Sequence, residues 1–185
     1  MEQMTLNIPV LALRGLTVFP DQTTGFDVER EISMLALNNA MEEGKDIFLV
    51  TQRELAVARP EESDLYAVGT VAHVLQIIKT SDSTVRVVVR GMSKGRIKRL
   101  WQTHPFLQAN VVLLEDDLPV RMTSRVEAVM RQTYLLFGEY RDMVPELSDE
   151  IVATVLDCDD PGKLADYIGY TINLRHMDRQ RILEE

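Results

Sequence analysis

The sequence predicts an α+β protein with two parts: a small six-stranded mixed β-barrel-like domain with one helix, then an all-α helical subdomain. Short β-branched runs separated by turn residues fill the first part, and longer stretches with helical spacing fill the second. The charge balance changes at the same place, from 12 basic and 13 acidic side chains in residues 1–114 to 8 and 16 in residues 115–185. We therefore expect the domains to span residues 1–117 and 118–185.

Six strands account for the apolar runs of the first domain. They are expected at residues 8–13, 23–28, 46–52, 68–78, 84–89 and 107–114. The run at residues 46–52 is so apolar in its middle that burial on both faces is expected. The runs at 68–78 and 84–89 form a hairpin around "KTSDS", where Asp82 favours a turn. Gly91 and Gly95 then allow a bulge or a sharp bend.

One helix interrupts these strands. The side chains of Met34, Leu37 and Met41 recur at helical spacing, and Gly44 is a plausible stop just after the last turn.

The second part carries helical signals throughout. Apolar and small side chains step by three or four along one predicted long helix: Met122, Val126, Val129, Thr133, Leu136, Tyr140 and Val144. Ser124 and Glu127 have the spacing of a capping box for this helix. Ser148 is expected to cap a shorter helix, and Asp160 with Pro161 to open a third. A final helix is expected to begin near His176.

Composition limits the class of protein. With 185 residues and 45% hydrophobic content the chain can bury a real core, and its net charge of −9 disfavours polyanions as partners. The single cysteine, Cys158, cannot form an internal disulfide, and no signal peptide is recognised. No apolar run approaches the roughly 20 residues that cross a bilayer. We expect a cytoplasmic protein without a membrane partner.

Catalytic, cofactor and metal sites are not expected. His73, His104 and His176 are scattered along the chain, and Ser93 and Lys94 are adjacent on a strand, so their side chains would point to opposite faces. The chain has no G-x-x-x-x-G-K-[ST] loop for nucleotide phosphates.

A run of positive side chains has no acidic neighbour between Ser83 and Leu114. It comprises Arg86, Arg90, Lys94, Arg96, Lys98 and Arg99, with Trp101 close by. Three hypotheses remain open: a face that binds RNA through phosphates and stacking, an edge strand protected from aggregation by its charges, or a partner for the acidic helical part. We favour the last two and expect nucleic acid to be an unlikely partner.

Several stretches together resemble the amino-terminal domain of Lon, the ATP-dependent protease. These are "IPVLALRGLTVFP", "DLYAVGTVAHVLQI", "DDPGKLADYIGYTINL" and "RQRILE", in the family's order and along nearly the whole chain. The resemblance implies a PUA-like barrel that selects misfolded, damaged or short-lived regulatory proteins for degradation. The resemblance also implies a longer homohexameric protein with ATPase and protease modules. This chain carries no motif of either module, so it resembles the substrate-recognition domain alone. The alternatives are a free-standing Lon-like adaptor and an RNA-binding PUA-like barrel.

The segment "GLTVFPDQ" is the candidate substrate-binding loop. Leu16, Phe19 and Pro20 are apolar in a predicted loop, where backbone polarity favours exposure, and the adaptable side chain of Met92 is a possible neighbour. Exposed apolar groups of this kind suit the capture of unfolded or damaged polypeptide. The alternative is that Phe19 tucks under the barrel as a structural plug.

Overall fold

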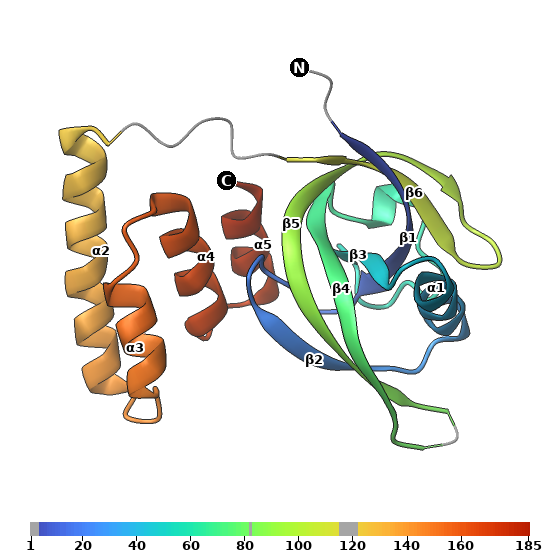
Figure 1. The fold of residues 1–185 in the computed structure, drawn as a ribbon, viewed down its shortest axis with the longest axis horizontal. Helices are drawn as coiled ribbons and strands as arrows, with labels where there is room; N and C mark the ends of the chain where they lie inside the picture. Colours follow the sequence, from blue (N-terminus) through green and yellow to red (C-terminus); the bar gives the residue numbers. More distant parts are fainter. Residues whose placement is uncertain (1–3, 82, 115–121) are drawn as a thin grey trace. The chain divides into compact units, whose positions relative to one another are not determined.

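The computed structural model describes residues 4–81, 83–114 and 122–185, which form two compact units (Figure 1). The described part of the first unit consists of residues 4–81, 83–114 and 175–185, and that of the second of residues 122–174. The predicted domain boundary between residues 117 and 118, like the turn residue Asp82, lies outside the described residues.

The first unit is a mixed sheet of six strands that curls into a barrel. Its elements are β1 (Thr5–Leu13), β2 (Thr23–Val28), α1 (Glu31–Glu42), β3 (Asp46–Thr51), a 3₁₀ turn (Glu62–Asp64), β4 (Val68–Lys79), β5 (Val85–Gln102) and β6 (Leu107–Leu113). The strand order is β2-β5-β4-β3-β1-β6, with β1 parallel to β3 and the other pairs antiparallel. The predicted six-stranded mixed sheet with one α-helix is confirmed.

The long strand β5 closes the barrel. Its first part pairs with β2 between Val85 and Arg90, and its second part pairs with β6 between Gly95 and Gln102. β4 follows it along the other side (Figure 1). The strand predicted at residues 84–89 therefore continues to Gln102, because bulges let it bend without losing its partners.

The core lies on both faces of the central strands. In β3, Ile47 and Leu49 enter one apolar cluster, and Phe48 and Val50 enter another. This alternation follows from the two-residue period of a strand. α1 contributes Leu37 to the first cluster. The prediction that residues 46–52 are buried on both faces is confirmed.

The final helix, α5 (His176–Glu184), packs on the barrel. Leu183 lies in a cluster with Phe19 and Val68, and the buried side chain of Gln180 donates a hydrogen bond of 2.9 Å to the carbonyl oxygen of Val68. Residues 175–185, expected in the helical subdomain, group with the barrel instead, because α5 buries its apolar face against β4.

The second unit contains α2 (Ser124–Met143), α3 (Asp149–Leu156) and α4 (Pro161–Thr171). As predicted, Ser148 caps α3 by accepting a hydrogen bond from the Ile151 amide, and Asp160 with Pro161 opens α4. The predicted capping box of α2 is wrong: Thr123 is the N-cap residue and accepts from the Val126 amide.

The buried face of α2 also differs from the predicted one. Met130 and Phe137 are buried against α3 and α4, whereas Val129 and Leu136 are exposed. Apolar side chains occur on two neighbouring stripes of this helix, so spacing alone did not identify the stripe that packs.

Candidate functional site

The loop between β1 and β2 is fastened to the barrel by its own backbone. The side-chain hydroxyl of Thr51 donates to the carbonyl oxygen of Leu16 at 2.8 Å, and that of Thr70 donates to the carbonyl oxygen of Val18 at 2.6 Å. Further along, the amide of Gly91 donates to the carbonyl oxygen of Gln22 at 2.9 Å. Because these carbonyl groups have partners inside the protein, the loop can enter the core at little cost in unpaired polar groups.

Phe19 is the centre of this anchored loop. Its side chain is 0% exposed and packs with Val68 and Leu183. The expectation that Phe19 is an exposed contact for substrate is therefore wrong, and the alternative of a structural plug describes its position. Burial of a large aromatic ring outweighs the usual exposure of a loop here.

Leu16 remains accessible at the side of the barrel. It is partly buried and lines a pocket of about 170 Å³ with a mixed lining. Apolar side chains such as Leu11, Phe26 and Val28 line it together with the charged residues Arg14, Asp27, Glu29 and Arg30. An apolar cavity of about 150 Å³ is large enough for benzene. The Leu16 pocket thus has the size for one apolar side chain.

Met92 lies at a β-bulge of β5, and the loop residue Pro20 lies close to it. Ser93 pairs with Val71 and Gly91 pairs with Ala72, so Met92 is the extra residue of β5 and is 52% exposed. A Cβ atom on Gly91 would lie 3.2 Å from the Cα atom of Pro20. The structure thus brings Pro20 close to the strand segment that carries Met92.

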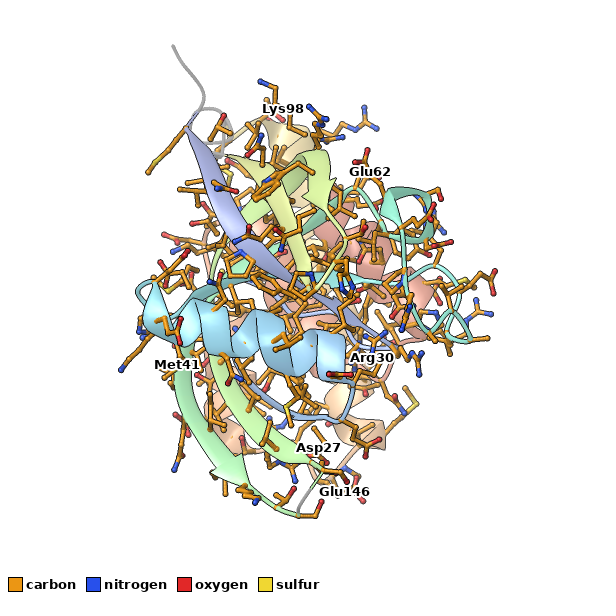
Figure 2. All side chains as sticks on the ribbon, turned by 90° about the vertical axis from the view of Figure 1, so that its right-hand side faces the viewer. Asp27, Arg30, Met41, Glu62, Lys98 and Glu146 are labelled. Atoms are coloured by element: carbon orange, nitrogen blue, oxygen red, sulfur yellow. The ribbon has the colours of Figure 1, made fainter. Side chains whose placement is uncertain are left out.

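A second and larger pocket is basic. It has a volume of about 570 Å³ and is lined by Arg14, Arg30, Arg59 and His104, with Glu31 as its one acidic residue. Figure 2 shows Arg30 at one end of α1 and Met41 at the other. Sequence reasoning missed this site because its residues come from four separate segments with no motif spacing between them.

The basic run of β5 is not on an edge strand. β5 has β4 on one side and β2 or β6 on the other, so the hypothesis of a charged edge guard is wrong. Arg86 lies 3.7 Å from the carboxylate of Asp27 on β2, and the indole nitrogen of Trp101 donates to Asn7 at 2.9 Å. Figure 2 places Lys98 at one end of the barrel, away from Arg30.

Within the described residues, no group of three or more His, Cys, Asp or Glu side chains is placed to hold a metal ion. In the same part of the chain, no helix is long and apolar enough to cross a membrane.

The first unit is thus a closed barrel with two pockets on its side, one of mixed lining and one mainly basic, which could receive a ligand. Residues 7–185 match the sequence model of the ATP-dependent protease La (LON) substrate-binding domain. The chain belongs to this family. The match is to a substrate-binding domain, in agreement with the prediction that the chain itself lacks the catalytic parts.

Relatives of known name are Lon proteases. The chain is 38% identical to the Lon protease of Clostridioides difficile over 181 residues, and 32% identical to Lon protease 1 of Bacillus subtilis over 183 residues. These matches cover 96% and 99% of this chain but only 23% of each relative. The chain thus spans less than a quarter of these proteins.

Solved structures share the fold. The N-terminal domain of a Mycobacterium avium complex Lon protease superposes with a TM-score of 0.76 at 20% identity, covering 97% of this chain and 90% of that one. The Lon N-terminal domain protein of Xanthomonas campestris gives 0.63 at 15% identity, with the same coverage. The predicted α+β fold is confirmed, and neither these structures nor the relatives favour a free-standing adaptor or an RNA-binding barrel.

Proposed function

We propose that this chain is the substrate-binding part of an ATP-dependent serine protease and that it holds unfolded or damaged polypeptides for degradation. The observation that carries the proposal is the match of residues 7–185 to the LON substrate-binding domain. Because the chain corresponds to less than a quarter of its relatives, the ATPase and protease activities belong to other parts of the whole protein.

The proposed contacts with polypeptide are the Leu16 pocket and the bulge around Pro20 and Met92. A domain that accepts many sequences needs small apolar contacts with little selectivity, and methionine adapts its shape to different partners. Exposed apolar segments occur in unfolded proteins and are scarce on folded ones. The surface is therefore expected to bind unfolded chains weakly and folded chains hardly at all.

The whole protein is further proposed to be a cytoplasmic homohexamer. The support is the family assignment and the many small contacts that several copies would offer one long substrate, since linked weak sites gain affinity together. Sedimentation of the full-length protein tests the assembly, and a monomer under working conditions would refute it.

The experiment on substrate binding compares a reduced, carboxymethylated protein with its native form by fluorescence anisotropy. Wild-type chain should bind the unfolded form with at least about tenfold higher affinity, a difference of about 1.4 kcal/mol. Met92→Ser should weaken this binding. Met41→Ser, which changes an exposed methionine on α1, serves as the matched control and should leave it unchanged. Equal binding of folded and unfolded protein by wild-type chain would contradict the proposal.

A further inference from the structure

The basic pocket has an excess of positive charge, because its arginines outnumber its carboxylates. Arg14, Arg30 and Arg59 line it, and Glu31 is its one carboxylate. Among the described residues, none of the three arginines forms an ion pair. Three guanidinium groups that share a pocket with one carboxylate, and form no ion pair with it, repel one another, and a bound anion relieves that repulsion.

Arg30 is held in place by neutral groups. One guanidinium nitrogen donates to the side-chain oxygen of Gln52 at 2.7 Å, and another donates to the carbonyl oxygen of Ala12. The amide nitrogen of Gln52 in turn donates to the carbonyl oxygen of Val57, at 3.0 Å. Burial, and then the positive charge of Arg14, lower the pKa of Arg30 below its usual value. The arginine is thus positioned before any ligand arrives, and no carboxylate of the described residues forms an ion pair with it.

Arg14 is fixed in a similar way. Its guanidinium group donates to the carbonyl oxygen of Val57 at 3.0 Å, so Arg14 and Gln52 hold the same segment of backbone. Arg59 lies two residues further along this segment and is exposed. The segment therefore brings the third guanidinium group to the pocket.

The basic pocket and the Leu16 pocket are neighbours. Arg14 and Arg30 line both of them. The Leu16 pocket also carries the carboxylates of Asp27 and Glu29, whereas the basic pocket has Glu31 alone. A ligand that spans the two pockets would therefore place its negative group on the side of Arg59 and its apolar group against Leu16.

We propose that the basic pocket binds a carboxylate of a polypeptide whose neighbouring apolar side chain enters the Leu16 pocket. The carboxylate belongs either to the end of the chain or to an Asp or Glu side chain. Arginine suits this group because its planar fork donates two parallel hydrogen bonds to the two carboxylate oxygens. That the carboxylate comes from a polypeptide rests on the proposed function.

Nucleic acid fits the same pocket less well. The pocket lining contains no Phe, Tyr or Trp side chain, so His104 is the one ring of this lining on which a base could stack. The net charge of −9 repels a polyanion at long range, whereas one carboxylate meets mainly the local arginines. These observations favour a single carboxylate over a phosphate backbone.

Three short peptides test the proposal by isothermal titration against the 185-residue chain. The first ends in leucine with a free carboxylate, the second is its C-terminal amide, and the third is the amide with a glutamate before the leucine. A chain-end site should bind the first at least about tenfold more tightly than the other two, and a side-chain site should prefer the third over the second by a similar factor. Equal affinity for all three peptides would overturn the proposal.

The variant Arg59→Gln tests whether the preference for a carboxylate arises from the basic pocket. It removes an exposed guanidinium group that no described residue pairs with, so folding should be unaffected. Affinity for the preferred peptide should fall at least about fivefold, as expected for a lost charged hydrogen bond. Arg99→Gln removes the same charge from an exposed position on β5 and should bind like wild type. Equal affinities of the two variants would overturn the proposal.

Competitors distinguish the ligand classes. Inorganic phosphate should displace the preferred peptide only weakly, and a single-stranded oligonucleotide should not displace it at physiological salt. Stronger displacement by the oligonucleotide than by the free peptide would overturn the proposal in favour of a nucleic-acid site. The chain could show no preference for a peptide carboxylate and still capture unfolded protein in a way that depends on Met92. That result would refute the carboxylate site in the basic pocket but not the proposed function.

Discussion

The carbonyl oxygen of Phe19 lies only 2.1 Å from the position that a Cβ atom on Gly91 would occupy. The loop crosses β5 at this point, and the amide of Asp21 donates to the carbonyl oxygen of Gly91 at 3.0 Å. Real Cβ atoms do not approach a backbone oxygen so closely, so only glycine permits this crossing. The glycine thus fixes both the path of the loop and the burial of Phe19.

Gly91→Ala should therefore destabilise the barrel. The added methyl group meets backbone rather than a flexible side chain, and overpacking of this kind costs about 1–3 kcal/mol. Urea unfolding followed by the fluorescence of Trp101, the only tryptophan, measures the loss. Gly25→Ala on β2 is the matched control, since its nearest neighbour would lie at 3.8 Å. A Gly91→Ala variant as stable as the control would show that the loop can move away.

Phe19→Ala tests the plug directly. Truncation of a fully buried Phe removes apolar contacts and leaves a cavity, at a cost of about 3–5 kcal/mol in the free energy of unfolding. Met92→Ser, at an exposed site, should change it by less than about 0.5 kcal/mol. Thermal melting of both variants provides the comparison. A melting temperature of Phe19→Ala close to that of wild type would mean that Phe19 is exposed, as the sequence suggested, and would contradict its burial.

The elements of the barrel follow from local sequence. β1 and β3 are buried on both faces, and their near-continuous apolar runs predict this burial from the sequence alone. The caps of α3 and α4 are equally local, since Ser148 and Asp160 act on amides three residues away. Such features need no knowledge of the tertiary structure.

The candidate sites depend on contacts that are distant in sequence. Phe19 is buried because Val68 and Leu183 cover it, and neither lies near it along the chain. Arg14 and Arg59 meet at one pocket because a backbone segment folds back to Arg14. No spacing rule in a single sequence predicts which distant residues meet in the fold. The sequence therefore left the burial of Phe19 as one of two hypotheses and gave no sign of the basic pocket.

The thiol of Cys158 should react slowly with alkylating reagents. Burial raises its pKa above the usual value. A backbone hydrogen bond with Asp160 and the positive charge of Lys163 oppose this shift in part, and the charges of Asp160 and Asp159 reinforce it. A raised pKa means less thiolate at neutral pH, and the thiolate is the reactive form. Iodoacetamide labelling followed by mass spectrometry measures the rate at this single cysteine.

The rate should rise with pH at higher values than for a free thiol, and the chain in denaturant should react faster than the folded chain. Reaction of folded and unfolded chain at the same rate would mean that the Cys158 environment is open to solvent.

Two adjacent residues of α2 provide the sharpest test of the helical unit. Phe137 is 3% exposed and packs with Tyr140 at a ring-centroid distance of 6.3 Å, whereas Leu136 is 56% exposed. Phe137→Ala should cost about 3–5 kcal/mol because it opens a cavity in the core formed with α3 and α4. Leu136→Ala should change stability by less than about 0.5 kcal/mol, since the side chain is largely in water.

Far-UV circular dichroism follows the helices during urea unfolding, and Trp101 fluorescence follows the barrel in the same samples. Because Phe137 packs within the helical unit, its truncation should shift the helical transition more than the Trp101 transition. Sequence spacing placed Leu136 on the packing face, and the structure places Phe137 there instead. A larger loss for Leu136→Ala than for Phe137→Ala would restore the face predicted from spacing and contradict the observed register of α2.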